Sequence, residues 1–181
     1  MKFLNSIGES EIREQSIKVW GYPFEPAIVY PEKEIFYHQI EEIHVKQYPP
    51  TLKIGKELIF VSKSLENQLI AFTGRNQINL SERAANWELI TEPFLDTTFT
   101  EEQTEATARM LERNGFSRGE ITGLREEIGR QMYKYNFDTL LWEWGVLGLM
   151  DVLSAMKPKL KKEVFRNFYW RAMEIEQRNG N

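Results

Sequence analysis

The sequence predicts an α+β chain, in which an N-terminal antiparallel β-meander or small barrel is followed by a C-terminal bundle of about four helices. Residues 27–78 hold short runs of β-branched and aromatic residues separated by Gly, Pro and polar turns, a pattern typical of such β-structures. After about residue 80, the sequence instead shows helix-start signals and apolar residues at helical spacing. We therefore expect a β-rich domain at 1–80, a linker with a short helix at 81–99, and a helical domain at 100–181.

The expected strands of the β-rich domain lie between residues that break regular structure. The runs AIVY, EIFYHQ and EEIHVKQY are bounded by prolines or turn residues, and TLKI and ELIFVSKS flank the turn at Gly55-Lys56. The run QLIAFTG ends at Gly74 and predicts a last strand at residues 68–74. The earlier segment SEIREQSIKVW is compatible with a short helix or an edge strand.

Capping signals place the first two helices of the helical domain. Thr100 is followed three residues later by Gln103, and Ser117 is followed in the same way by Glu120. Both pairs match the capping box, in which two side chains satisfy the free N–H groups of a helix start. Gly115 lies between them and is expected to end the first of these helices.

Three further helices are expected from the same signals. NLSERAANWELI predicts a short helix capped by Asn79 or Ser81. Asp138 is expected to cap a helix that runs through Met156, and Pro158 lies near the first turn of a last helix that ends at about residue 178. The connections are only a few residues long, so neighbouring helices are expected to pack antiparallel.

The run EIFYHQIEEIHV resembles the opening of PH-like small barrels of bacterial proteins, in which an I-x-Y strand leads into an I-x-x-I-x-V strand. The matching residues are Ile35, Tyr37, Ile40, Ile43 and Val45. The likeness covers roughly residues 27–78. It implies a closing amphipathic helix, at 81–90 or 100–114, and a domain that binds proteins, peptides or lipid headgroups.

The amino-acid composition of the chain argues against several classes of function. The formal net charge of −4 argues against a general nucleic-acid binder, which needs cations to neutralise phosphates. The absence of cysteine removes disulfides, thiolate zinc sites and cysteine nucleophiles, and it fits a reducing cytoplasm. The N-terminal residues contain no apolar stretch that would make a signal peptide. The apolar segment 140–156 is interrupted by Glu143 and Asp151, so we expect a cytoplasmic protein with no transmembrane segment.

Both histidines of the chain lie in YHQIEEIHV, residues 37–45. The polar side chains of interest there are His38, Glu41, Glu42 and His44. In an uninterrupted strand the two histidines would lie about 20 Å apart, so only a bend between them would let them share an ion. We expect these polar side chains to face water while Ile43 and Val45 carry the packing, and we expect no metal and no cofactor.

Glu143 and Asp151 are eight residues apart and would lie on one face of a single helix. Such a pair would serve as an acid/base or metal site inside a helical bundle. The alternative is a polar rim that faces water or meets a cation, the candidates being Arg125, Arg130 and Arg171. Gly145 and Gly148 on the same helix would allow close approach of another helix.

Aromatic residues are concentrated at two places in the helical domain. The candidate interface residues are Trp142, Trp144, Tyr169 and Trp170. Core packing is the alternative for all four. Trp142 and Trp144 would project about 200° apart on a helix, which one core does not easily accommodate. They are therefore the sequence's best indication of a surface for self-association or for a partner.

A basic cluster precedes and opens the last helix. Its members are Lys157, Lys159, Lys161, Lys162 and Arg166. It would suit an anionic lipid surface, an acidic partner or nucleic acid, or it is a solvated connection between helices.

Together these patterns favour a non-enzymatic interaction or adaptor protein that binds a protein partner or another copy of itself. One alternative is an acidic inhibitor or immunity-type protein, because residues 1–156 carry a formal charge of −8. The other is a carboxylate-dependent hydrolase. The sequence holds no phosphate-binding glycine loop, no G-x-S-x-G motif and no H-E-x-x-H motif.

Overall fold

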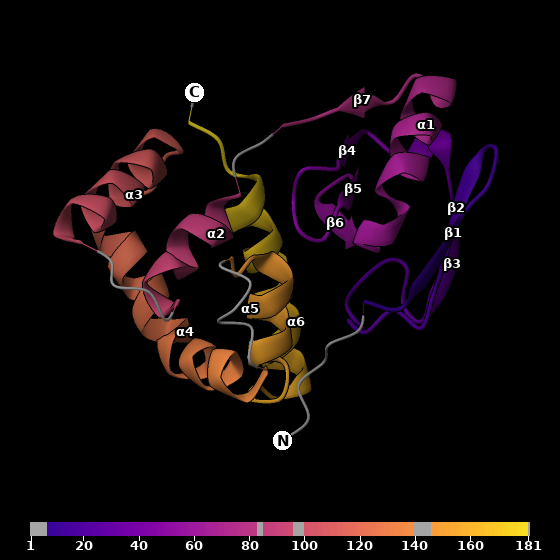
Figure 1. Cartoon of the computed structure of the whole chain (residues 1–181). Coiled ribbons are helices and arrows are strands. Elements are labelled where there is room, and N and C mark those ends of the chain that lie inside the picture. Colours follow the sequence, from indigo (N-terminus) through magenta and orange to yellow (C-terminus); the bar gives the residue numbers. More distant parts are fainter. Residues whose placement is uncertain (1–6, 83–84, 96–99, 140–145, 181) are drawn as a thin grey trace. The chain divides into compact units, whose positions relative to one another are not determined.

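The structure, a computed structural model, describes residues 7–82, 85–95, 100–139 and 146–180 (Figure 1). The chain divides into two compact units, a β-unit within Leu4–Ala84 and a helical unit within Ala85–Asn181. The fold class predicted from the sequence is confirmed, since strands in antiparallel sheets come first and a group of helices follows. The division between the units falls inside the segment 81–99 that the sequence marks as a linker.

The first sheet of the β-unit has three antiparallel strands in the order β1-β2-β3. Strand β1 spans Glu9–Ile12, β2 spans Ser16–Trp20 and β3 spans Glu32–Phe36. The segment that was ambiguous in sequence is thus a hairpin, closed by a hydrogen bond from the Arg13 N–H to the Ser16 carbonyl.

The second sheet has four strands in the order β6-β5-β4-β7. Its strands are β4 at Glu42–His44, β5 at Thr51–Ile54, β6 at Glu57–Phe60 and β7 at Asn79–Leu80. Strands β4, β5 and β6 pair antiparallel, and β7 pairs parallel with β4. The short 3₁₀ helix η1, Tyr37–Gln39, separates β3 in the first sheet from β4 in the second.

The strand predicted at residues 68–74 is wrong, because this segment lies in helix α1, Glu66–Asn76. Leu69, Phe72 and Thr73 are the buried residues of α1, and their spacing of three and four is helical. The helix follows η2, Lys63–Leu65, and provides the crossover that the parallel β4–β7 pair requires.

The expected strand AIVY, residues 27–30, is instead part of a turn-rich loop. The Ala27 N–H donates to the Phe24 carbonyl and the Tyr30 N–H to the Ala27 carbonyl. Glu57 of β6 is buried and accepts the Ile28 N–H, at 3.1 and 3.3 Å to its two oxygens. The loop is therefore fixed against β6 by hydrogen bonds rather than by strand pairing.

The helical unit begins with α2, Asn86–Thr91, and the 3₁₀ helix η3, Glu92–Phe94. The longer helices are α3 at Glu101–Arg113, α4 at Arg118–Thr139, α5 at Leu149–Met156 and α6 at Lys162–Gln177. Trp87, Ile90 and Phe94 are buried. The short helix of the predicted linker is therefore a packed part of this unit.

The capping signals are confirmed. The Thr100 hydroxyl accepts the Gln103 N–H, and the Gln103 side chain accepts the Thr100 N–H. Gly115 follows the end of α3 with φ of +87°, a conformation that favours glycine. The Ser117 hydroxyl accepts the Glu120 N–H at the start of α4.

Three helix boundaries differ from the predictions. Helix α2 begins at Asn86 and is not capped by Asn79, which lies in β7, or by Ser81. A single helix over 138–156 is wrong, because residues 146–148 are not helical and Gly148 is the N-cap of α5. Pro158 lies in the turn between α5 and α6 instead of in the first turn of α6.

Candidate functional site

The three-stranded sheet has one apolar face and one polar face. Ile17, Val19 and Ile35 are buried on the first. Because side chains alternate along a strand, the neighbouring residues form the opposite face, which we call the outer sheet face. It consists of Glu9, Glu11, Ser16, Lys18, Trp20, Glu32, Glu34 and Phe36.

The strand register arranges the outer sheet face in rows across β1, β2 and β3. Trp20 of the central strand is paired with Glu9 on one side and Glu32 on the other. Lys18, two residues earlier, is paired in the same way with Glu11 and Glu34. Directly opposed residues on one face have Cβ atoms about 4.5–5.5 Å apart. Each central side chain therefore lies between two glutamates.

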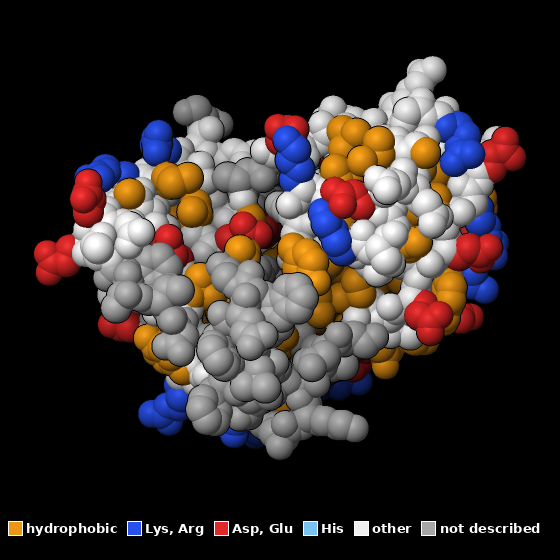
Figure 2. Space-filling model, viewed as in Figure 1, with side chains coloured by type: hydrophobic (Ala, Val, Ile, Leu, Met, Phe, Trp, Pro, Cys, Tyr) orange, Lys and Arg blue, Asp and Glu red, His pale blue; other side chains and the backbone are white. Residues whose placement is uncertain are grey.

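The glutamates of the Lys18 row are neutralised within the chain. Arg13 lies 2.9 Å from Glu11 and 3.0 Å from Glu34, and the Ser16 hydroxyl donates to Glu34 at 2.6 Å. The hydrogen bond from Ser16, together with Arg13 and Lys18, lowers the pKa of Glu34. Figure 2 shows basic and acidic side chains side by side at the edge where β1–β3 lie.

The glutamates of the Trp20 row lack such partners. In the part of the chain that the structure describes, no ion pair or side-chain hydrogen bond involves Glu9 or Glu32. Both side chains are exposed, and Trp20 between them is partly exposed. The row therefore presents two uncompensated carboxylates on either side of an accessible indole.

Exposed aromatic side chains continue from the end of β3. Phe36 is 46% exposed, and the next two residues, Tyr37 and His38, are exposed as well. The His38 ring stacks on Phe36 with centroids 6.0 Å apart and meets the edge of Tyr37 at 5.6 Å. The Gln39 side chain holds this turn by accepting the Phe36 N–H. Accessible aromatic rings are typical of protein interfaces.

The prediction that both histidines face water is confirmed for His38 and wrong for His44. His44 is 1% exposed, because β4 lies between β5 and β7 inside the second sheet and is buried on both faces. Its Nε2 atom lies 3.7 Å from the Glu42 carboxylate. Among the described residues, no group of three or more His, Asp or Glu side chains is placed to hold a metal ion.

Glu41 and Glu42 share the ammonium group of Lys53. The Lys53 ammonium lies 3.0 Å from Glu41 and 3.4 Å from Glu42. Glu41 also accepts the Gly55 N–H. These contacts connect β4 to the β5–β6 hairpin, and they account for both carboxylates as structural groups.

A group of one buried and two partly buried carboxylates lies in the helical unit, where sequence reasoning found only Asp151. Asp151 accepts the Gly148 N–H at 2.9 Å and the Tyr135 hydroxyl proton at 3.1 Å. Burial raises its pKa. The pKa of Glu88 on α2 is raised too, first by burial and then by the charge of Asp151. Glu143, the partner predicted for Asp151, lies outside the described residues.

Glu176 on α6 is the third carboxylate of this group. Its side chain is buried, and burial raises its pKa to about 8. Its Oε2 atom accepts the Trp87 N–H at 2.9 Å, so it also caps the start of α2. The charge of Glu88 adds to the rise in its pKa. The three carboxylates come from α2, α5 and α6, and α2 is far from the other two helices in sequence.

Of the three arginines expected to meet Glu143 and Asp151, Arg125 and Arg171 have other partners. The Arg125 side chain donates to the carbonyls of Leu89 and Ile90 at 3.2 and 3.1 Å. Arg171 forms an ion pair with Glu127. Neither set of contacts involves Asp151, so the predicted polar rim around it does not form with these two residues.

Of the predicted aromatic interface, Trp142 and Trp144 lie outside the described residues, together with Gly145. Tyr169 is fully buried and belongs to the core of the helical unit, while Trp170 is 40% exposed. The Trp170 ring meets the edge of Tyr169 at 5.4 Å. Only Trp170 of the described pair is therefore accessible to a partner.

The basic cluster lies in the α5–α6 turn and the first part of α6. Its exposed members are Lys159, Lys161, Lys162 and Arg166, and Lys157 is partly exposed. Lys161 is the N-cap residue of α6 and offers it no side-chain acceptor. The cluster is accessible, as an anion-binding surface has to be.

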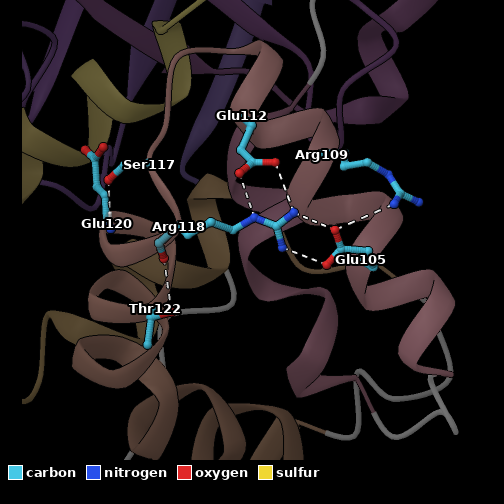
Figure 3. Close-up of polar contacts among 7 residues, drawn as sticks. All are labelled: Glu105, Arg109, Glu112, Ser117, Arg118, Glu120 and Thr122. Atoms are coloured by element: carbon cyan, nitrogen blue, oxygen red, sulfur yellow. Dashed lines mark hydrogen bonds and ion pairs between the residues drawn. The ribbon is translucent and has the colours of Figure 1, made fainter.

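Sequence reasoning missed the role of Arg118, which joins α3 to α4 (Figure 3). Its guanidinium contacts the Glu105 carboxylate at 2.5 and 2.7 Å and the Glu112 carboxylate at 2.6 and 3.1 Å. Figure 3 shows Arg109 reaching Glu105 from the other side. The residue types at these spacings could have indicated ion pairs, but only the fold brings Glu105 and Arg118 together.

Comparison with family models, curated proteins and solved structures finds no match for this chain. Among the described helices, none has the length and apolarity needed to cross a bilayer. The likeness of residues 27–78 to PH-like barrels stays a prediction, and in this chain the helix that follows the β4–β6 strands is α1.

Proposed function

We propose that this chain is a non-enzymatic interaction protein whose outer sheet face receives a basic segment of a partner protein. The observation that carries the proposal is the Trp20 row, where an accessible indole lies between the uncompensated carboxylates of Glu9 and Glu32. Aromatic residues supply much of the binding energy of protein interfaces. Carboxylates beside them select a cationic partner and accelerate its association.

The exposed aromatic residues after β3 extend this surface. Phe36 lies on the same face as Trp20, and Tyr37 and His38 follow it in η1. A partner segment that lies along the strands would meet carboxylates at one end and aromatic rings at the other. An inhibitor or immunity-type role is a special case of this proposal, in which the basic partner is an enzyme.

The test compares partner capture by three forms of the full-length chain. One form is unaltered, one carries Glu9→Lys and Glu32→Lys, and the control carries Glu14→Lys and Glu126→Lys. The control residues are exposed and lie outside the outer sheet face. Proteins retained from a lysate of the native host are quantified by mass spectrometry at low and high salt.

We expect at least one basic protein to be retained by the unaltered and control chains, to be lost from the Glu9/Glu32 variant, and to be weakened by salt. Retention that is the same for all three chains would contradict the proposal. Self-association is measured on the same samples by sedimentation. A dimer lost in the Glu9/Glu32 variant would identify another copy of the chain as the partner.

A carboxylate-dependent hydrolase is the second candidate, favoured by the raised pKa values of Glu88 and Asp151. A raised pKa lets a carboxyl group keep its proton to higher pH, which a general acid requires. A panel of chromogenic glycosides and esters tests this function. Turnover that is lost in Glu88→Gln and kept in Glu126→Gln would support it, and absence of turnover across the panel would count against it.

A further inference from the structure

We propose that the Trp20 row is a subsite for an arginine side chain of the partner. This inference rests on the proposed function and specifies the chemistry of its central contact. The guanidinium would stack on the Trp20 indole and donate hydrogen bonds to Glu9 and Glu32 on its two sides.

In the neighbouring Lys18 row, a guanidinium of this chain already contacts two glutamates on the outer strands. Arg13 reaches Glu11 on β1 at 2.9 Å and Glu34 on β3 at 3.0 Å. One guanidinium therefore spans the two outer strands across the central strand. Glu9 and Glu32 lie two residues further along the same strands. Since successive residues on one face of a sheet repeat the same cross-strand geometry, they offer a similar spacing to a guanidinium from outside.

The central residue distinguishes the two rows. Lys18 stands between Glu11 and Glu34 and contributes a positive charge there. Trp20 stands between Glu9 and Glu32 and contributes none. The Trp20 row therefore keeps both negative charges and adds a ring whose face attracts cations. A cation arriving from a partner would supply the charge that Lys18 and Arg13 supply in the next row.

Arginine fits this row better than lysine. Its planar guanidinium stacks on aromatic rings and presents several N–H donors in one plane, so it can contact the indole and carboxylates at once. A lysine ammonium is a compact and strongly hydrated charge that would lose more hydration on binding. We therefore expect discrimination by side-chain shape as well as by charge.

The experiment follows the Trp20 indole N–H of the full-length chain by nuclear magnetic resonance. The chain contains five tryptophans, and the signal that disappears in Trp20→Phe belongs to Trp20. Three blocked tripeptides are titrated in turn, Gly-Arg-Gly, Gly-Lys-Gly and Gly-citrulline-Gly, in which citrulline is a neutral analogue of arginine. The titrations are repeated with Glu9→Gln/Glu32→Gln and with the control Glu14→Gln/Glu126→Gln.

We expect the arginine peptide to shift the Trp20 signal with an affinity several-fold higher than that of the lysine peptide, and citrulline to have little effect. The Glu9/Glu32 variant should bind arginine about tenfold more weakly, and the control should bind as the unaltered chain does. Equal responses to arginine and lysine, or no shift of Trp20, would overturn the inference. The peptide comparison on the unaltered chain decides this even if a variant fails to fold.

The two proposals fail in different ways. Capture of a partner that depends on Glu9 and Glu32, with no preference of Trp20 for arginine, would leave the proposed function standing and reject the subsite. An arginine-specific shift of Trp20, with partner capture independent of Glu9 and Glu32, would establish the subsite and reject its role in partner binding.

Discussion

Asn86 and Glu176 cap each other's helices in the interior of the helical unit. The Asn86 amide donates to the carbonyls of Ile175 and Arg178 at the end of α6, in both cases at 2.8 Å. The Glu176 carboxylate accepts the Trp87 N–H at the start of α2. Helix ends leave backbone groups without partners inside the helix. The start of α2 and the end of α6 therefore satisfy each other where water does not reach.

Asn86→Ala should destabilise the helical unit strongly. The substitution removes the donor of one buried and one partly buried backbone carbonyl, and the acceptor of the Asn114 side chain, which donates to Asn86 at 2.7 Å. Buried groups left without partners cost about 1–3 kcal/mol each, so we expect the free energy of unfolding to fall by roughly 2–4 kcal/mol. Urea denaturation measures it. Asn167→Ala, at an exposed position of α6, is the control and should change stability little.

Glu176 should make the stability of the helical unit depend on pH. Its pKa is raised from an ordinary value of 4.5 to about 8 in the folded state. Below 4.5 it is protonated whether folded or unfolded, and its contribution to stability is fully present. As the pH rises toward 8 only the unfolded chain ionises, so stability is lost. Above pH 8 this loss is complete, and the contribution of Glu176 to stability no longer changes with pH.

Glu176→Gln tests this dependence, because glutamine keeps the hydrogen bond to Trp87 and cannot ionise. We expect the unaltered chain to lose a few kcal/mol between pH 5 and pH 8 and the variant to lose distinctly less. Glu88 and Asp151 also have raised pKa values and remain in both chains, so the difference between the curves reports Glu176 together with its coupling to Glu88. Glu174→Gln, on the exposed side of α6, should leave the dependence unchanged; identical curves for Glu176→Gln would contradict the assignment.

Sequence signals that act within one helical turn correctly predicted where helices of the helical unit begin. The pairs Thr100–Gln103 and Ser117–Glu120 indicated helix starts from residues three apart, and the structure has them. The error at QLIAFTG has the opposite origin. A short apolar run fits a strand or a buried helix equally, and here it forms α1, which lies in the connection between the parallel strands β4 and β7.

Part of the candidate site could be predicted from the sequence. In SIKVW, the apolar residues Ile17 and Val19 alternate with Ser16, Lys18 and Trp20, a period of two that indicates a strand with one buried face. The pairing of Trp20 with Glu9 and Glu32 depends on strand register, which the hairpin sets and composition does not. Glu88, Asp151 and Glu176 are brought together by the packing of helices that lie up to almost 90 residues apart in the chain. No local sequence pattern indicates this packing.

Arg118→Ala should have a small effect that salt removes. Arg118 is exposed and holds Glu105 and Glu112 by ion pairs, and exposed ion pairs contribute little to stability even when their geometry is good. We expect a slight decrease in the thermal midpoint at low salt and none at about 1 M salt, where charges are screened within a few ångströms. Arg130→Ala, also exposed on α4, is the control. A large decrease that persists in high salt would show that the contact contributes through packing instead.

Gly8→Ala should destabilise the β-unit more than Gly55→Ala, although both glycines have positive φ, of +79° and +58°. That conformation costs about 1–2 kcal/mol for a residue with a side chain, and this is the whole effect expected at Gly55, where a methyl group would meet nothing within 4 Å. At Gly8 the methyl would lie 2.5 Å from the Trp20 carbonyl oxygen and 2.8 Å from that of Gly21. Backbone has to move to relieve these contacts.

The same substitution connects stability to the candidate site. Gly8 directly precedes Glu9, and the clash falls on the backbone of Trp20, so the shift should disturb the spacing of the Trp20 row. We expect Gly8→Ala to lower the urea midpoint more than Gly55→Ala and, at temperatures where it remains folded, to weaken the response of the Trp20 indole to the arginine peptide. Gly55→Ala should leave that response intact, because Gly55 lies in the β5–β6 turn of the other sheet. Equal destabilisation by the two substitutions would mean that the approach of Gly8 to the Trp20 carbonyl does not constrain the hairpin.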